Sequence, residues 1–138
     1  MKILGEIKHI LGMDVEIDSV TQLVHVSQAE YIRKSVRDYS KNGPNGELKL
    51  YSTPMDSGQP FYKAQSPVAG TEEALQMLSL PYRELIGTLL WIANRTRPDI
   101  SYAVDTLAKY TNSPAELRWK ALLRVLGYLG KTLDYCIK

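Results

Sequence analysis

The sequence predicts an α+β fold, in which a β-hairpin and a helix are followed by a long irregular linker and a mainly helical unit of three helices. Three observations carry this prediction. Apolar and acidic residues alternate over residues 10–18, which is typical of a half-buried strand. Turn-forming glycine and proline residues are spread over residues 40–80. Beyond Pro81, apolar residues recur at helical spacing as far as residue 129.

The predicted hairpin begins with the alternating strand. Its apolar face holds Leu11, Met13, Val15 and Ile17, and its acidic face holds Asp14, Glu16 and Asp18. A turn over residues 18–22 leads into a returning strand over 23–26. Acidic residues two apart on a strand could contribute to a two-metal site if a second acidic strand faced them. The sequence offers no such strand, so we expect a solvated acidic face.

A helix follows the hairpin, with Ser27 and Glu30 spaced as a capping box at its start. Its predicted apolar face is Ala29, Ile32, Val36 and Tyr39, and its basic face is Arg33, Lys34, Arg37 and Lys41. Residues 40–80 then lack a regular pattern, apart from a possible short helix at Glu72–Leu78. So long an irregular stretch is unusual inside a compact domain, so we interpret it as a flexible linker.

Three helices are predicted after residue 81. The first has an apolar stripe from Tyr82 to Ala93, and a turn with Thr96, Pro98 and Asp99 caps the second. The third opens at Ser113, Pro114 and Glu116, the clearest helix start in the chain. Its predicted core face is Leu117, Ala121, Leu122, Val125, Leu126 and Leu129, and its basic face is Lys120, Arg124 and Lys131.

Composition narrows the class of protein. The 138 residues suffice for one domain with a modest core, and the single cysteine, Cys136, excludes an internal disulfide. Neither a membrane-spanning run nor a secretory leader is evident, so we expect a cytoplasmic or nuclear protein that is not secreted. His9, His25 and Cys136 form no nucleophile–base pattern. We therefore expect no catalytic residue and no bound cofactor or metal in this chain.

Charge is unevenly distributed along the chain. Residues 1–80 carry a formal charge of −2 and residues 81–138 a charge of +4. The turn between the first two C-terminal helices holds two arginines, Arg95 and Arg97, which cannot both serve an apolar core. Guanidinium groups beside a helix N-terminus suit a phosphate. The alternative is that they pair with Asp99, Asp105 or helix carbonyl groups.

Short segments along the chain resemble one known family. They are LGEIKHILG (residues 4–12), VSQAEYI (26–32), STPM (52–55), YRELIGTLLW (82–91), TRPDI (96–100), WKA (119–121) and RVLGYL (124–129). In this order they resemble the reverse transcriptase of copia-type LTR retrotransposons, in the part of the Pol polyprotein after the polymerase catalytic motif.

The resemblance implies a role for each part. Residues 1–39 would be the palm end with a primer-grip-like hairpin and the first helix, residues 40–80 a flexible linker, and residues 81–138 a thumb-like and connection-like unit. A thumb follows the phosphates of a template–primer duplex. The expected phosphate contacts are Arg95, Arg97, Lys120 and Arg124, with weak and non-specific affinity for RNA–DNA or DNA duplex.

The same resemblance implies what this chain lacks. The paired catalytic aspartates that hold Mg²⁺ would lie upstream, with the palm and fingers, and the ribonuclease H region would lie downstream. We therefore expect the chain to be inactive as a polymerase by itself. It also departs from the family pattern at Gly127, where arginine is common, and at Gly130-Lys131, which inverts the usual order. Each glycine should weaken the last helix by about 1 kcal/mol relative to alanine.

Two other interpretations stay open at this point. A decayed or repurposed element could serve as a protein-interaction module without nucleic-acid activity, because the apolar hairpin face would then be exposed. Residues 82–111 could also be a DNA-reading helix-turn-helix. Its second helix, residues 99–110, offers Lys109 as its one base, which argues against insertion into a groove.

Overall fold

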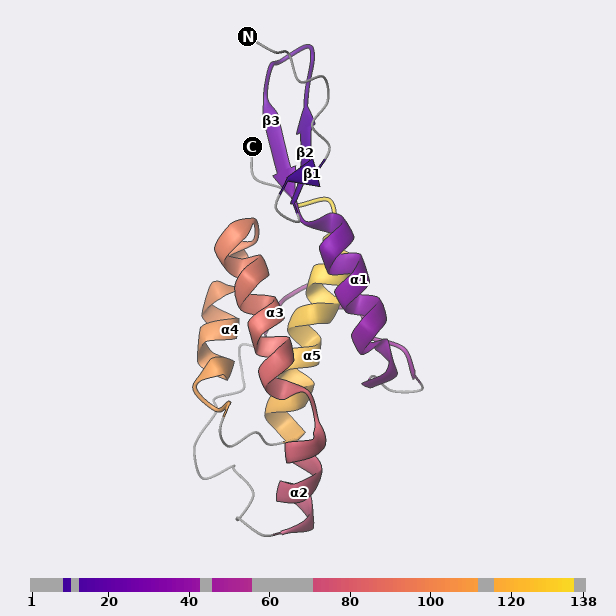
Figure 1. The fold of residues 1–138 in the computed structure, drawn as a ribbon, viewed down its shortest axis with the longest axis vertical. Coiled ribbons are helices and arrows are strands. Elements are labelled where there is room, and N and C mark those ends of the chain that lie inside the picture. The colour runs from indigo at the N-terminus through magenta and orange to yellow at the C-terminus, as the bar shows by residue number, and fades with distance from the viewer. Residues whose placement is uncertain (1–8, 11–12, 43–45, 56–70, 112–115, 136–138) are drawn as a thin grey trace.

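A computed structural model describes residues 9–10, 13–42, 46–55, 71–111 and 116–135. Its strands are β1 (His9–Ile10), β2 (Met13–Ile17) and β3 (Val24–Ser27), and its helices are α1 (Ala29–Tyr39), α2 (Glu72–Ser79), α3 (Tyr82–Arg95), α4 (Ser101–Ala108) and α5 (Glu116–Lys131). Short 3-10 turns lie at Ser40–Asn42 and Pro98–Ile100. The predicted α+β fold is confirmed. The hairpin projects from one end of the helices, and α2 lies at the other end (Figure 1).

The hairpin is part of a three-stranded antiparallel sheet in the order β1-β2-β3. Val15 pairs with Val26 across the predicted hairpin, and the Asp18 carboxylate accepts the backbone N–H of Val20 at 2.8 Å in the turn. The sequence did not predict β1. Residues 10–18 were expected to form one strand, whereas Ile10 pairs back onto Met13. Residues 11–12, between the two paired strands, lie outside the described residues.

The N-terminus of α1 shows that the predicted capping box is wrong. Gln28, not Ser27, is the N-cap residue, and it makes no side-chain cap hydrogen bond. Instead, the backbone N–H of Glu30 donates to Asp14 Oδ2 on β2 at 3.2 Å, while the Glu30 carboxylate pairs with Arg33. An acid at a helix N-terminus is favourable because the free N–H groups there carry partial positive charge. Asp14 therefore joins the strand to the helix and is half-buried, whereas Glu16 and Asp18 of the same predicted face are exposed, as expected.

The core lies among α1, α3, α4 and α5, and it confirms most of the apolar positions predicted from helical spacing. Leu117 is an exception: it is half-buried, whereas its neighbours Arg118 and Trp119 are buried. The fully buried side chains include Ile32, Leu85, Leu89, Ile92, Ile100, Leu107, Leu122, Leu126 and Leu129. The expected helix start at Ser113 and Pro114 lies outside the described residues, and α5 is described from Glu116. None of the helices in the described part of the chain is long and apolar enough to cross a membrane.

The start of α4 differs from its predicted cap. A 3-10 turn at Pro98–Ile100 precedes the helix, with Arg97 at its N-cap and without a side-chain cap hydrogen bond. Neither Thr96 nor Asp99 caps α4. Instead, the Thr96 side chain contacts Gln28, and the Asp99 side chain contacts Tyr128 of α5.

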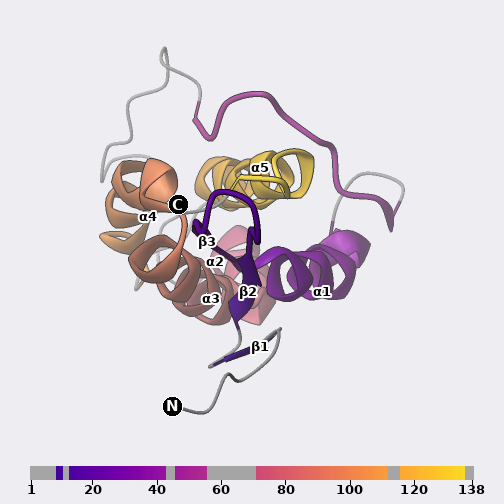
Figure 2. The same ribbon diagram turned by 90° about the horizontal axis from the view of Figure 1, so that it is seen from above.

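Residues 46–55, which we call the strap, follow an irregular path across the face of α5 that points away from α3 (Figure 2). Leu48 and Met55 of the strap pack against the edge of the core. Helix α2, in the same predicted linker, agrees with the short helix expected there. The division of the chain into three parts stays a prediction, but the strap makes specific contacts with the helical unit.

Candidate functional site

The two arginines of the α3–α4 turn have different surroundings. Arg97 is 1% exposed. Its guanidinium donates to Asp99 Oδ1 at 3.0 Å and Oδ2 at 2.8 Å, and to the carbonyl and hydroxyl of Thr132 at 2.9 and 2.6 Å. It also lies close to the rings of Tyr128 and Tyr135, at 5.4 and 4.9 Å from their centroids. Arg97 therefore joins the turn to the C-terminal end of α5.

A second set of polar contacts joins the α3–α4 turn to the start of α1. The buried Gln28 amide lies 2.7 Å from the Thr96 hydroxyl. When the amide is oriented to satisfy all its neighbours, its NH₂ also donates to the carbonyl of Ile92, and its oxygen accepts the indole N–H of Trp91 at 3.1 Å. Arg95 is exposed and lies over the Trp91 ring, 4.3 Å from its centroid. The turn thus connects α1, α3 and α5.

The pKa values of two groups around Arg97, the Asp99 carboxyl and the Tyr128 hydroxyl, are shifted in opposite directions. Burial raises the pKa of the Asp99 carboxyl, but hydrogen bonds from Arg97 and Tyr128 outweigh it, so the pKa lies below its ordinary value of 3.8. Burial and the hydrogen bond that Tyr128 donates to Asp99 at 2.6 Å raise the pKa of the tyrosine. Asp99 is therefore ionised and Tyr128 protonated at neutral pH, which is the combination that these hydrogen bonds require.

The surroundings of the four residues expected to contact phosphate differ from one another. For Arg97 the structure favours the alternative considered above, pairing with Asp99, because its donors are directed into the protein. Arg95 remains accessible. Lys120 is exposed and forms an ion pair with Glu116 at 2.8 Å, one helical turn away. Arg124 lies on the outer face of α5, against the strap. The four residues thus belong to two places in the fold, the α3–α4 turn and α5.

The outer face of α5 holds two cations that contact hydroxyl groups. Arg124 Nη2 donates to Thr53 Oγ1 at 2.8 Å, and Lys131 Nζ donates to Ser52 Oγ at 2.8 Å. Arg124 also lies over the ring of Tyr51, at 4.6 Å from its centroid. The two cations are seven positions apart in the sequence, so they lie on one helix face, roughly 10 Å apart along its axis. These hydroxyl partners carry no charge, so among the described residues neither cation is paired to a carboxylate.

Two glycines allow the strap to lie this close to α5. A Cβ atom at Gly127 would lie 2.1 Å from the carbonyl oxygen of Lys49, which is closer than real Cβ contacts occur. At Gly130 a Cβ atom would lie 3.2 Å from side-chain atoms of Leu50 and Val36. Gly127 and Gly130, which depart from the family pattern, thus leave the space on α5 into which the strap packs.

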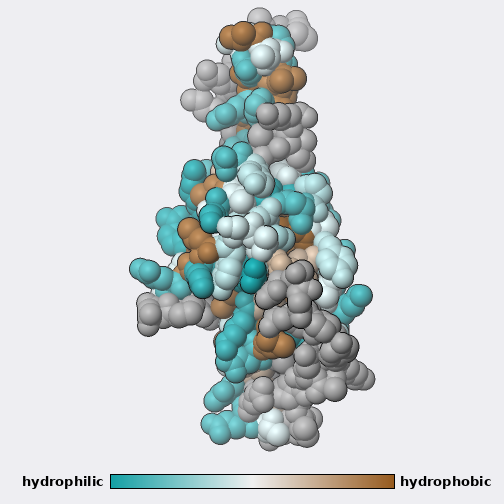
Figure 3. All heavy atoms as spheres, turned by 180° about the vertical axis from the view of Figure 1, so that it is seen from behind, coloured by the Kyte–Doolittle hydropathy of each residue, from teal (hydrophilic) through white to brown (hydrophobic). Residues whose placement is uncertain are grey.

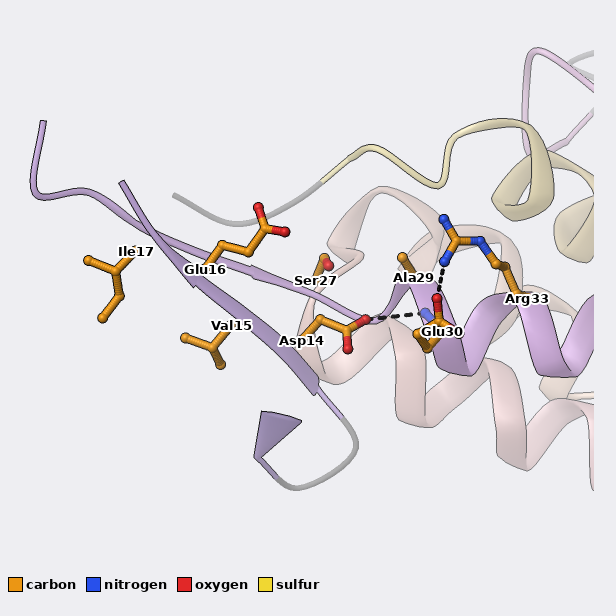
Figure 4. Close-up of a pocket in the computed structure, with 8 residues that line it drawn as sticks. All are labelled: Asp14, Val15, Glu16, Ile17, Ser27, Ala29, Glu30 and Arg33. Carbon is orange, nitrogen blue, oxygen red and sulfur yellow. Dashed lines mark hydrogen bonds and ion pairs between the residues drawn. The ribbon is translucent and has the colours of Figure 1, made fainter. Parts of the chain in front are cut away.

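The hollow between β2 and the start of α1 has a volume of about 590 Å³. Three acidic side chains line it, those of Asp14, Glu16 and Glu30, together with Arg33 (Figure 4). Asp14 and Glu30 are already engaged, the first with the N-terminus of α1 and the second with Arg33. Within the described residues, no group of three His, Cys, Asp or Glu side chains could hold a metal ion.

The chain is similar over nearly its whole length to retrotransposon proteins. It is 32% identical over 138 residues to a transposon Ty5-1 protein of Saccharomyces cerevisiae, 29% identical over 137 residues to the retrovirus-related Pol polyprotein from transposon TNT 1-94 of Nicotiana tabacum, and 33% identical over 133 residues to that from transposon RE2 of Arabidopsis thaliana. These alignments cover 96–100% of the chain. The chain is related to retrotransposon Pol polyproteins.

The chain spans a limited part of each of these retrotransposon proteins. It covers 41% of the Ty5-1 protein, 10% of the TNT 1-94 polyprotein and 8% of the RE2 polyprotein. No protein-family model matches the chain, and no solved structure does either.

Within this Pol-related chain, the TRPDI segment that carried part of the resemblance has a structural role. Thr96 contacts Gln28, Arg97 and Asp99 pair, and Ile100 is fully buried. Sequence analysis missed the strap as a partner of α5. The signal that could have revealed it is the glycine pair at positions 127 and 130, because glycine inside a helix often marks the close approach of another segment.

Proposed function

We propose that the chain is a reverse-transcriptase segment of a retrotransposon Pol polyprotein, the palm end and thumb, and that it holds the backbone of a template–primer duplex. The rest of such a polyprotein would supply the palm, the fingers, the aspartates that hold Mg²⁺ and the ribonuclease H region. The relationship to Pol polyproteins and the order of the sequence segments support this proposal.

The observation that carries the duplex contact is the pair of cations on α5 that have no carboxylate partner among the described residues. Duplex nucleic acid presents a dense row of phosphates, and a cation that is not paired to a carboxylate loses little when it turns to a phosphate. Arg124 and Lys131 meet this condition because their described partners are hydroxyls. Arg95, held over Trp91, is a further contact, whereas Lys120 must first leave Glu116.

We expect the purified chain to bind a 20-base-pair RNA–DNA or DNA duplex with a micromolar or weaker Kd, and to lose affinity steeply as salt is added. The double variant Arg124→Ala/Lys131→Ala should bind more weakly. Its plot of log K against log salt concentration should be flatter by about 1.8, because each phosphate contact contributes about 0.9 to the slope. Fluorescence anisotropy of a labelled duplex at several salt concentrations measures both quantities.

The matched control is Arg83→Ala/Lys109→Ala, which removes the same charge from exposed positions on α3 and at the C-cap of α4. It should leave the slope near that of the wild type. Equal slopes for the wild type and the α5 variant would contradict the proposed contact, and so would equal losses in the α5 variant and the control.

One observation favours a second candidate function, self-association through the hairpin. Ile17, Val20, Leu23 and Val24 are 54, 89, 47 and 45% exposed, and Figure 3 shows hydrophobic side chains at the hairpin end of the molecule. Among the described strands, β3 is an edge of the sheet, so its backbone could pair with β3 of a second copy.

If the hairpin mediates self-association, sedimentation velocity should detect a dimer that grows with protein concentration, and Val24→Lys should abolish it, because a lysine on an edge strand opposes edge-to-edge pairing. Leu75→Lys places the same charge on α2, where the leucine is 62% exposed, and should leave the dimer intact. A monomer at all concentrations would exclude this second candidate.

A further inference from the structure

We propose that Ser52 and Thr53 of the strap, with Arg124 and Lys131 of α5, form a phosphate-binding site, which we call the strap site. The inference rests on the proposed function and deepens it, since it names the groups that seat one backbone phosphate. It adds two hydroxyl groups from a segment that the sequence presents as a linker.

The direction of the hydrogen bonds determines what the strap site can bind. Arginine and protonated lysine have donors and no acceptor, so Ser52 and Thr53 must accept from them. Each hydroxyl then keeps its own O–H to donate elsewhere. Both residues are exposed, so these two donors are available at the surface. An anion that approaches meets two O–H donors next to two positive charges.

The chemistry of the site selects a phosphate group. Four donor groups and no described carboxylate partner favour a ligand with several acceptor oxygens and negative charge. A phosphodiester of a nucleic-acid backbone fits these requirements, and the site contains no element that would read a base. We therefore expect the strap site to position the backbone without sequence preference.

The backbone of the strap is fixed independently of the ligand. The carbonyl of Lys49 lies in the groove at Gly127, and Leu48 and Met55 pack against the core. Arg124 is further held over the Tyr51 ring and by a longer contact of its Nε with the Thr53 carbonyl, at 3.4 Å. The hydroxyls and cations are thus prearranged, and binding a phosphate would require little ordering of the chain.

The deciding variant is Ser52→Ala/Thr53→Val, which removes both hydroxyls from exposed positions and leaves every charge in place. We expect duplex binding to weaken about five- to tenfold, as for the loss of two hydrogen bonds to a charged group at a solvated site. The salt slope should stay at the wild-type value, because neutral donors release no counterions. Ser79→Ala/Thr106→Val is the matched control, since these hydroxyls donate to carbonyls of their own helices.

Comparison of the strap variant with the α5 variant tests the strap site independently of the proposed duplex contact. If the strap variant binds duplex as the wild type does while Arg124→Ala/Lys131→Ala loses affinity, the strap site is wrong and the duplex contact stands. A strap variant with a flatter salt slope would also contradict the site, because it would mean that the α5 cations had moved.

Titration of the ¹⁵N-labelled chain with inorganic phosphate provides a direct measurement. We expect saturable shifts of the Ser52 and Thr53 amides that disappear in the strap variant. Such shifts in a chain that does not bind duplex would keep the site and overturn the proposed function. Their absence at phosphate concentrations of tens of millimolar would overturn the site.

Discussion

Replacing Arg97 with methionine is expected to lower the free energy of unfolding by about 2–3 kcal/mol. Methionine fills much of the same space but removes every donor of the buried guanidinium. Asp99 then loses both hydrogen bonds from Arg97, and the buried carbonyl of Thr132 loses its side-chain donor. The loss is smaller than for a fully buried ion pair because the Asp99 side chain is 36% exposed. Urea denaturation followed by tryptophan fluorescence measures the change.

Arg95→Met is the matched control for this prediction. Arg95 is exposed and contacts the Trp91 ring, so we expect a loss of less than about 1 kcal/mol. The effect of Arg97→Met should also depend on pH. The pKa of Asp99 is lowered in the folded chain, so its contribution is complete above its ordinary value of 3.8 and is lost as pH falls through the lowered value. The difference between the two unfolding curves should therefore narrow below about pH 3.8, and the part that comes from the hydrogen bonds to Thr132 should remain.

The opposite result would support the expected role of Arg97 as a phosphate contact. If Arg97→Met unfolded at the same urea concentration as the wild type but bound duplex with a flatter salt slope, the side chain would act at the surface. The structure favours the internal role because all the described contacts of the guanidinium lie within the protein.

The elements of the fold could be predicted from sequence because each depends on neighbouring residues. The spacing of Leu85, Leu89 and Leu126 within their helices reports which face is buried, whatever that face packs against. The Asp18 turn likewise depends on hydrogen bonds within a few residues. The α+β class, the helix at Glu72–Ser79 and the three C-terminal helices follow from such local signals.

Contacts between distant residues could not be predicted in this way. The capping box at Ser27 was a reasonable local choice, but a carboxylate sixteen residues before Glu30 took the role of acceptor. Arg97 resembles a surface base in the sequence, since its partner Thr132 is thirty-five residues away. The hydroxyls of the strap gain a function from cations that follow them by more than seventy residues. These pairs are set by packing of the whole chain, which periodicity does not report.

Replacing Gly127 with alanine is expected to lower the free energy of unfolding by about 1–2 kcal/mol and to release the strap. Alanine favours a helix over glycine by about 1 kcal/mol, so local propensity alone predicts stabilisation. The new Cβ atom would lie 2.1 Å from the carbonyl oxygen of Lys49, and this backbone atom can move away only if the strap moves. Overpacking of this kind costs about 1–3 kcal/mol, to which the lost packing of the strap adds.

Gly87→Ala distinguishes propensity from packing. Gly87 is an exposed residue of α3, and a Cβ atom there would contact nothing within 4 Å, so we expect stabilisation by up to about 1 kcal/mol. The same substitution in two helices should therefore have opposite signs. Hydrogen exchange at the amides of residues 49–53 should become faster in Gly127→Ala and stay unchanged in Gly87→Ala. If both variants were stabilised alike, the strap would not pack on α5 in solution, and Gly127 would be a weak point of the helix rather than the groove that receives the strap.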